Sequence, residues 1–73
     1  MINIALFGLG RIGYMHAQNL AKHGNFNLKY VYDIDKNLAK KVARKLQSHS
    51  IDKPSIAFKD KKIEAIFIAS ATS

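Results

Sequence analysis

The chain has 73 residues, no cysteine and a formal net charge of +7, from twelve Lys and Arg against five Asp and Glu. This length lies below the roughly 100–150 residues of an ordinary domain, which excludes a two-domain enzyme and argues against a complete single-domain one. The absence of cysteine excludes disulfides, thiolate metal sites and a cysteine nucleophile.

The first half of the chain alternates short apolar runs with a helical pattern. Ile2–Phe7 is apolar without clean alternation, which predicts a strand buried on both faces. A helical pattern begins at Arg11, and Gly24 and Asn25 are expected to close it. Residues 28–32 then predict a second strand, because aromatic and β-branched residues dominate it.

The second half continues this alternation. Asp35 can cap a second helix. The lysines of this helix lie opposite an apolar stripe, so this basic segment is explained as the solvent-exposed face of an amphipathic helix. A very short edge strand around Ile51 and a helical turn capped by Ser55 are expected next. The last predicted strand begins at Ala65 and ends at Ala69.

This order predicts an α/β fold with parallel strands joined by right-handed crossovers. It corresponds to a partial Rossmann fold, β-α-β-α-β, that forms the first half of a dinucleotide-binding domain and the first strand of the second half. In the usual strand order 3-2-1-4 the strand from Ala65 to Ala69 becomes an exposed edge. We expect this edge to pair with another copy of the chain or with the missing part of a split enzyme.

A glycine-rich motif joins the first strand to the first helix. Gly8, Gly10 and Gly13 fit the pattern G-x-G-x-x-G, and Asp33 follows Gly13 by twenty residues at the end of the second strand. A strand before the glycines, a helix after them and an acid about 20 residues further on are the context of a dinucleotide-binding motif. The motif therefore predicts dinucleotide binding, against the alternative of a glycine-rich turn that binds no nucleotide.

Each glycine has a chemical reason in such a motif. Gly8 allows a tight turn, Gly10 lets the backbone approach a pyrophosphate, and Gly13 lets the helix pack closely against the first strand. The helix N-terminus offers N–H groups and a partial positive charge to the phosphates.

The acidic residue indicates which cofactor binds. Asp33 can accept hydrogen bonds from the ribose hydroxyls, and its charge repels the 2′-phosphate of NADP. Asp35 adds a second negative charge nearby, which Lys36 offsets only in part. NAD is therefore the expected cofactor, and NADP is disfavoured.

Other partners and locations are not supported by the sequence. The basic charge comes without a nucleic-acid-binding motif, so we expect no nucleic-acid partner. His16 and His23 lie about 10 Å apart along a helix, too far for one metal ion, and His49 is isolated.

No apolar run approaches the roughly 20 residues of a membrane span, and no signal peptide precedes the first strand, so we expect a cytoplasmic protein.

Four segments of this sequence match segments of a known protein family in the same order, and together they cover nearly the whole chain. They are residues 7–13 (FGLGRIG) with His16 and Ala17, residues 30–35 (YVYDID), residues 54–58 (PSIAF) with Asp60, and residues 63–73 (IEAIFIASATS). Together they resemble the opening of the glucose–fructose oxidoreductase and inositol 2-dehydrogenase family, and within it the inositol 2-dehydrogenases in particular.

The resemblance implies an oxidoreductase that transfers hydride from a polyol or sugar alcohol to NAD(P). It implies that the pyrophosphate lies at Gly8, Gly10, Arg11, Ile12 and Gly13. It implies that the adenosine ribose and adenine lie at Asp33 and Ile34, and that the loop under the cofactor contains Ser70, Ala71 and Thr72.

The catalytic residues of that family have no counterpart in this sequence. The family continues the last loop into a histidine, followed by a Glu-Lys-Pro motif, a downstream Asp and His, and a substrate-binding domain. Residues 1–73 would then be the N-terminal part of an NAD-binding domain that holds NAD or its adenosine half and shows no dehydrogenase activity alone. The alternative is a non-enzymatic nucleotide-binding or interaction module.

Overall fold

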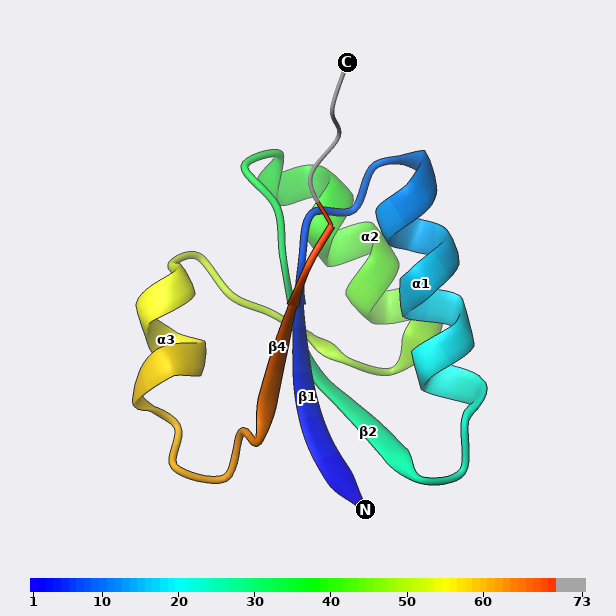
Figure 1. Cartoon of the computed structure of the whole chain (residues 1–73). Helices are drawn as coiled ribbons and strands as arrows, with labels where there is room; N and C mark the ends of the chain where they lie inside the picture. The colour runs from blue at the N-terminus through cyan, green and yellow to red at the C-terminus, as the bar shows by residue number, and fades with distance from the viewer. Residues whose placement is uncertain (70–73) are drawn as a thin grey trace.

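A computed structural model describes residues 1–69, and its elements follow the order expected from the sequence. They are β1 (Ile2–Phe7), α1 (Arg11–Lys22), β2 (Phe26–Tyr32), α2 (Lys36–Leu46), β3 (His49–Ser50), α3 (Pro54–Lys59) and β4 (Ala65–Ile68). Helices α1 and α2 cover one face of the sheet and α3 covers the other, which gives three layers (Figure 1).

The sheet has the strand order β3-β2-β1-β4, and every pair of neighbouring strands is parallel. This confirms the predicted α/β fold, a partial Rossmann fold. Strand β1 is central and pairs with β2 on one side and β4 on the other, where Ile4 lies opposite Ala65. Within residues 1–69, β4 is an edge strand, as predicted from the usual strand order.

Strand β1 is buried on both of its faces, as its apolar run predicted. Ile4 and Leu6 belong to a core cluster that includes side chains of α1 and α2. Ala5 and Phe7 belong to a second cluster with Ala57 of α3. These four consecutive side chains of β1, residues 4–7, are at most 9% exposed, which is typical of a central parallel strand covered by helices on both sides.

A bulge in β2 shifts its pairing with β1 and was not predicted. Ile4 pairs with Leu28, but the next residue, Ala5, pairs with Tyr30, which leaves Lys29 as the extra residue. An extra residue reverses the alternation of the strand. Leu28 and Val31 therefore share the α1/α2 side although they are three positions apart in the strand, whereas Tyr30 packs on the α3 side.

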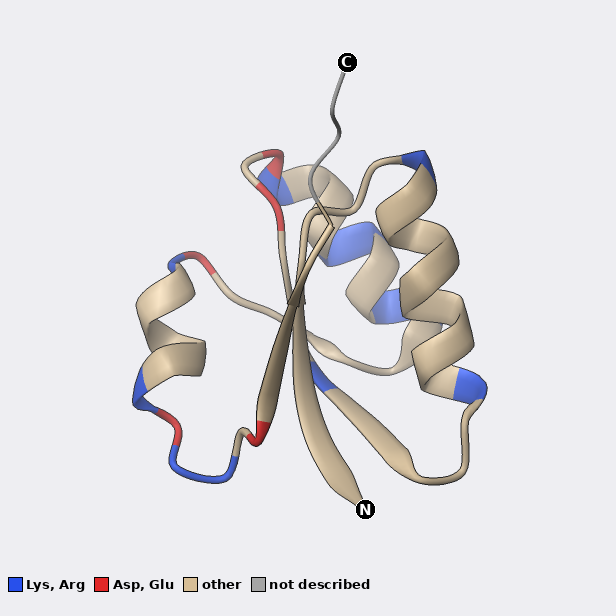
Figure 2. Cartoon of the chain, viewed as in Figure 1, with Lys and Arg blue, Asp and Glu red and all other residues tan. Residues whose placement is uncertain are grey.

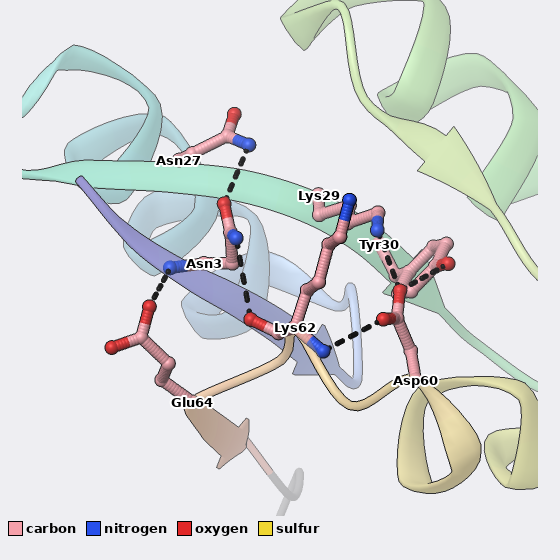
Figure 3. A network of polar contacts seen from close by, with 7 residues as sticks. All are labelled: Asn3, Asn27, Lys29, Tyr30, Asp60, Lys62 and Glu64. Atoms are coloured by element: carbon pink, nitrogen blue, oxygen red, sulfur yellow. Dashed lines mark hydrogen bonds and ion pairs between the residues drawn. The ribbon is translucent and has the colours of Figure 1, made fainter.

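The bulge brings Lys29 and Tyr30 to Asp60, the residue that follows α3. The Lys29 ammonium and the Tyr30 hydroxyl lie 2.6 Å and 2.7 Å from Oδ2 of Asp60, and the Lys62 N–H donates to Oδ1 at 2.9 Å (Figure 3). Hydrogen bonds from Lys29, Tyr30 and Lys62 hold the pKa of Asp60 well below its usual range. The bond from its hydroxyl to Asp60 also raises the pKa of Tyr30.

Asn3 extends this polar network to the start of β4. Its side-chain amide donates to the Lys62 carbonyl at 3.2 Å and accepts from the Asn27 amide at 2.9 Å (Figure 3). The Asn3 N–H donates to a Glu64 carboxylate oxygen at 3.3 Å, and the Glu64 N–H donates to the Asn3 carbonyl at 2.9 Å. The loop before β4 is therefore tied to β1, which fixes the register in which β4 enters the sheet.

The predicted boundaries around the α1–β2 turn are correct at the end of α1 and wrong at the start of β2. Helix α1 ends at Lys22 with His23 as its C-cap, so Gly24 and Asn25 lie directly after it, as predicted, and the His23 ring accepts the Asn25 N–H at 3.2 Å. Strand β2 begins at Phe26, two residues before the predicted start.

The boundaries after α2 also needed correction. Strand β3 is His49–Ser50, although Ile51 still donates its N–H to the Val31 carbonyl at 3.1 Å. Ser55 does not cap α3: the helix begins at Pro54, and Lys53 precedes it without a side-chain cap. Proline suits this first position because it lacks the N–H that a cap would satisfy. The predicted Asp35 cap of α2 is confirmed, since its carboxylate accepts the Leu38 N–H at 3.1 Å.

The basic residues of α2 are exposed, and its apolar stripe is packed against the sheet, as predicted. Figure 2 shows basic segments along α2 and at the start of α1, and acidic segments in the loop between β2 and α2. Among residues 1–69, no helix has the length and apolar character that crossing a membrane requires.

Candidate cofactor-binding site

The carboxyl ends of β1, β2 and β4 meet at one edge of the sheet, beside the β1–α1 loop (Figure 1). Main-chain hydrogen bonds join them: the Gly8 N–H donates to the Tyr32 carbonyl and the Ala69 N–H to the Phe7 carbonyl, both at 2.8 Å. In parallel α/β sheets, ligands bind at this edge, where the strand order reverses. Here β1 is the strand at which the order reverses, with β2 and β4 on its two sides.

Gly8 and Gly13 are required by close main-chain contacts. Gly8 has a φ of +96°, and a Cβ built on it would lie 2.0 Å from the Ala69 carbonyl oxygen. A Cβ on Gly13 would lie 1.9 Å from the Gly8 carbonyl oxygen. The first turn of α1 therefore rests directly on the backbone of the β1–α1 loop, in agreement with the close packing predicted for Gly13.

Gly10 differs from these two glycines because its surroundings are open. No heavy atom outside its chain neighbours lies within 4 Å of a Cβ built there. Gly10 is also the residue before α1, and no side chain caps the first N–H groups of that helix. The first turn contains no acidic residue. This loop therefore presents free N–H donors and the positive end of a helix dipole to an anion such as a pyrophosphate.

Asp33 joins the β1–α1 loop to the β2–α2 loop at this edge of the sheet. Its Oδ2 accepts the Leu9 N–H and its Oδ1 accepts the Asp35 N–H, each at 2.8 Å. These two bonds fix the orientation of the carboxylate, and each oxygen keeps a lone pair for a further donor. The carboxylate can therefore accept ribose hydroxyls without releasing either loop.

A hollow of about 260 Å³ lies beside Asp33, between the ends of β1, β2 and β4. Its walls are mostly apolar, with Phe7 and Tyr32 packed edge to face at 5.5 Å between ring centroids. Ile34 forms an outer wall and is 87% exposed. A second hollow, of about 320 Å³, is lined by Ile12 and by residues of β4.

The structure brings together most of the predicted site residues. Gly8, Gly10, Arg11, Ile12, Gly13, Asp33 and Ile34 all lie at this edge or on the hollows beside it. Their contact with a cofactor stays a prediction, and Ser70, Ala71 and Thr72 lie outside the described residues. In residues 1–69 no three His, Asp or Glu side chains are grouped to hold a metal ion.

Two contributors to this edge were missed from the sequence. Leu9 acts through its N–H, and Ala69 acts through its carbonyl oxygen, which faces Gly8. Neither carries a side-chain signal, because both act through main-chain atoms. The one available hint was the position of Leu9 between the first two glycines.

A family profile described as "Oxidoreductase family, NAD-binding Rossmann fold" matches residues 2–73. The chain belongs to this GFO/IDH/MocA oxidoreductase family. The resemblance seen in the sequence is therefore confirmed, and the glycine loop, Asp33 and β4 are parts of a GFO/IDH/MocA NAD-binding Rossmann domain. A comparison with curated protein sequences found no match.

Solved structures of inositol dehydrogenases have the same fold as this chain. The myo-inositol dehydrogenase of Corynebacterium glutamicum is 33% identical, with a TM-score of 0.87 over 96% of this chain and 21% of that chain. The myo-inositol 2-dehydrogenase of Lactobacillus plantarum is 27% identical, with a TM-score of 0.85 over 97% of this chain and 22% of that one.

A third similar structure contains a bound cofactor. The myo-inositol dehydrogenase of Lactobacillus casei, solved with NAD(H) and myo-inositol, is 22% identical, with a TM-score of 0.87 over 97% of this chain and 22% of that chain. The chain therefore spans about a fifth of the length of these three structures.

Proposed function

We propose that this chain binds the adenosine diphosphate half of NAD at the carboxyl edge of its sheet. The observation that carries the proposal is the Leu9–Asp33 hydrogen bond beside the open backbone of Gly10. It sets a carboxylate acceptor for ribose next to a loop of free N–H donors for phosphate. A dinucleotide needs both at once, and a simple anion needs only the second.

The pyrophosphate site in this proposal is the β1–α1 loop. Gly8 shapes the turn, Gly10 leaves space for the phosphates, and Gly13 allows α1 to begin directly behind them. Arg11 and Ile12 are exposed on the first turn of α1, where a guanidinium can add a charge-assisted hydrogen bond to a phosphate oxygen.

The adenosine site in this proposal is the hollow beside Asp33. The carboxylate accepts the ribose hydroxyls, and Ile34 supplies an apolar surface for one face of the adenine. Ser70, Ala71 and Thr72 are proposed to form the loop under the cofactor, on the basis of their positions in the family motif.

The charges at this edge support NAD over NADP. Asp33 and Asp35 both lie in the β2–α2 loop, and a 2′-phosphate on the ribose would face the carboxylate of Asp33. Repulsion between these anions, together with the loss of the hydroxyl that Asp33 accepts, disfavours NADP.

The enzyme reaction is proposed from the family. We infer that residues 1–73 are the N-terminal part of an NAD-binding domain in a dehydrogenase acting on a polyol or sugar alcohol. Myo-inositol is the first candidate substrate, because the structure at 33% identity is a myo-inositol dehydrogenase. Bound NAD would supply the hydride acceptor. We assign no catalytic role to a residue of this chain and expect it to show no dehydrogenase activity alone.

Strand β4 is proposed as the pairing edge for further polypeptide. Phe67 is 42% exposed and Ile68 is 73% exposed on this four-residue strand. An apolar edge with unpaired main-chain groups favours pairing with another strand. That strand would come from a second copy of the chain or from the rest of a longer enzyme.

Calorimetric titration tests the cofactor proposal. We expect NAD, ADP-ribose and AMP to bind the chain, and NADP to bind at least about tenfold more weakly, as expected for a lost hydrogen bond and an added repulsion. We expect Asp33→Ala to abolish the preference for NAD, and Asp52→Ala, an exposed carboxylate between β3 and α3, to preserve it. Equal affinity of the wild type for NAD and NADP would contradict the proposal.

A further inference from the structure

A groove lies between α1 and α2, beside the cofactor loop. Its volume is about 370 Å³, which falls within the roughly 300–1,000 Å³ of small-molecule sites. Its apolar lining comes mainly from Tyr14 of α1 and from Leu38 and Val42 of α2. The proposed NAD site does not use these three side chains.

Three cationic side chains complete the lining of this groove: Arg11, Lys41 and Lys45. No acidic residue lines it, and the one salt bridge among residues 1–69 joins Lys29 to Asp60 elsewhere. The Lys45 ammonium lies 5.9 Å from the centroid of the Tyr14 ring, so a cation stands directly over the apolar lining. Figure 2 shows basic segments of α2 beside α1.

We propose that this groove binds a small amphiphilic anion, a carboxylate that carries a short aliphatic chain. The apolar lining would hold the chain, and Lys41 and Lys45 would hold the carboxylate. A purely apolar ligand would leave the cations without partners, and a bare anion would leave the apolar lining exposed to water. This proposal goes beyond the proposed cofactor binding, because it assigns a second ligand to a different set of side chains.

The groove and the proposed pyrophosphate site share Arg11. Leu9 and Gly10 also contribute to the groove. An anion in the groove would therefore compete with the cofactor for the guanidinium. The test is run without cofactor, so that its result does not depend on whether NAD binds.

Amide NMR of the ¹⁵N-labelled chain provides the test, with titrations of acetate, butanoate, hexanoate and 1-hexanol. We expect hexanoate to shift the amides of Tyr14, Leu38 and Val42 saturably. Affinity should rise along the acid series, by about fourfold for each methylene withdrawn from water. The neutral alcohol should bind more weakly than hexanoate. Equal binding of hexanoate and acetate, equal binding of hexanoate and hexanol, or shifts confined to β4 would each overturn the proposal.

Lysine variants separate this site from general attraction to a basic protein. Lys41→Gln and Lys45→Gln should each weaken hexanoate binding about two- to fivefold, the usual effect of one exposed charge. Lys40→Gln is the matched control, because Lys40 is exposed on the same helix and does not line the groove. Equal weakening by all three variants would show a response to net charge alone and would overturn the assignment.

Discussion

The N–H of Leu9 donates a hydrogen bond to Oδ2 of Asp33 across 2.8 Å, so the carboxylate proposed for ribose binding also holds the glycine loop in place. The other carboxylate oxygen accepts the Asp35 N–H at the same distance. One side chain therefore sets the relative position of the β1–α1 and β2–α2 loops before any ligand arrives. Asp33 therefore supports the backbone conformation of both loops, and the shape of the proposed site depends on that conformation.

Replacing Asp33 should lower stability as well as cofactor affinity. Asp33→Ala removes two acceptors of main-chain N–H groups. At roughly 1 kcal/mol for each hydrogen bond, we expect the free energy of unfolding to fall by about 2 kcal/mol. Asp33→Asn keeps one oxygen acceptor and should lose about half as much. Urea unfolding measures both variants, and a loss in Asp33→Ala no larger than in Asp52→Ala would contradict this account.

Gly8→Ala should severely destabilise the fold. The methyl group would lie 2.0 Å from the Ala69 carbonyl oxygen, a main-chain atom that cannot rotate away, and the φ of +96° is itself unfavourable for alanine. We expect a loss of more than about 3 kcal/mol, as for other clashes that force the backbone to move. Thermal unfolding followed by circular dichroism measures this loss. An unfolding midpoint of Gly8→Ala equal to that of the wild type would refute the close contact.

Gly10→Ala should separate binding from folding. A Cβ at Gly10 meets no atom within 4 Å, so we expect stability within about 0.5 kcal/mol of the wild type. The same methyl group would stand where the pyrophosphate is proposed to lie, so NAD affinity should fall at least about tenfold. Gly24→Ala is the matched control, because it is also free of contacts and lies away from the site. Unchanged NAD affinity in Gly10→Ala would exclude this loop as the phosphate site.

The Asp60 network should make stability depend on pH in the acid range. Contacts with Lys29, Tyr30 and the Lys62 N–H lower the pKa of Asp60 in the folded chain. Above about pH 5 the carboxyl is ionised in both states, so the network contributes fully. Below about pH 4 the unfolded chain takes up a proton that the folded chain does not, so stability falls as the pH decreases.

Asp60→Asn measures this contribution. We expect the difference in free energy of unfolding between the wild type and this variant to be constant from about pH 5 to 8 and to shrink from about pH 4 downward. Because other titrating groups are common to both proteins, they cancel in the difference. A difference that is independent of pH down to about pH 2 would show that Asp60 does not carry the effect.

The β4 edge should make the chain associate. We expect the wild-type chain to elute from a size-exclusion column as a dimer or larger species with increasing concentration. Ile68→Lys should return it to a monomer, because a charge on an edge strand opposes pairing. Ile34→Lys is the control, since Ile34 is 87% exposed in the β2–α2 loop. A wild-type monomer at every concentration would count against β4 as a self-pairing edge.

The fold and most of the proposed site could be predicted because their signals are local. The spacing of Gly8, Gly10 and Gly13 between a strand and a helix, and Asp33 after the next strand, reflect steric and hydrogen-bonding demands within one βαβ unit. The apolar run of β1 predicted burial on both faces, as in a parallel sheet. The strand order was predicted from the usual order 3-2-1-4 of a Rossmann fold.

The remaining features depend on contacts that a linear pattern does not encode. The bulge at Lys29 is satisfied by Asp60, 31 residues away, so no window around β2 reveals it. The Leu9–Asp33 bond uses a main-chain donor, which every residue except proline has. Ser55 was misplaced as a cap because serine and proline both favour helix starts, and proline occupied the first helical position.

The corner formed by Gly8, Gly13 and Ala69 is assembled from main-chain atoms, with carbonyl oxygens standing where side chains would otherwise be. Its shape therefore depends on two missing methyl groups and hardly at all on the chemistry of neighbouring side chains. The neighbouring side chains can therefore change in sequence without changing the geometry of this main-chain contact. A TM-score of 0.87 at 22% identity shows that the fold persists when most of the side chains differ.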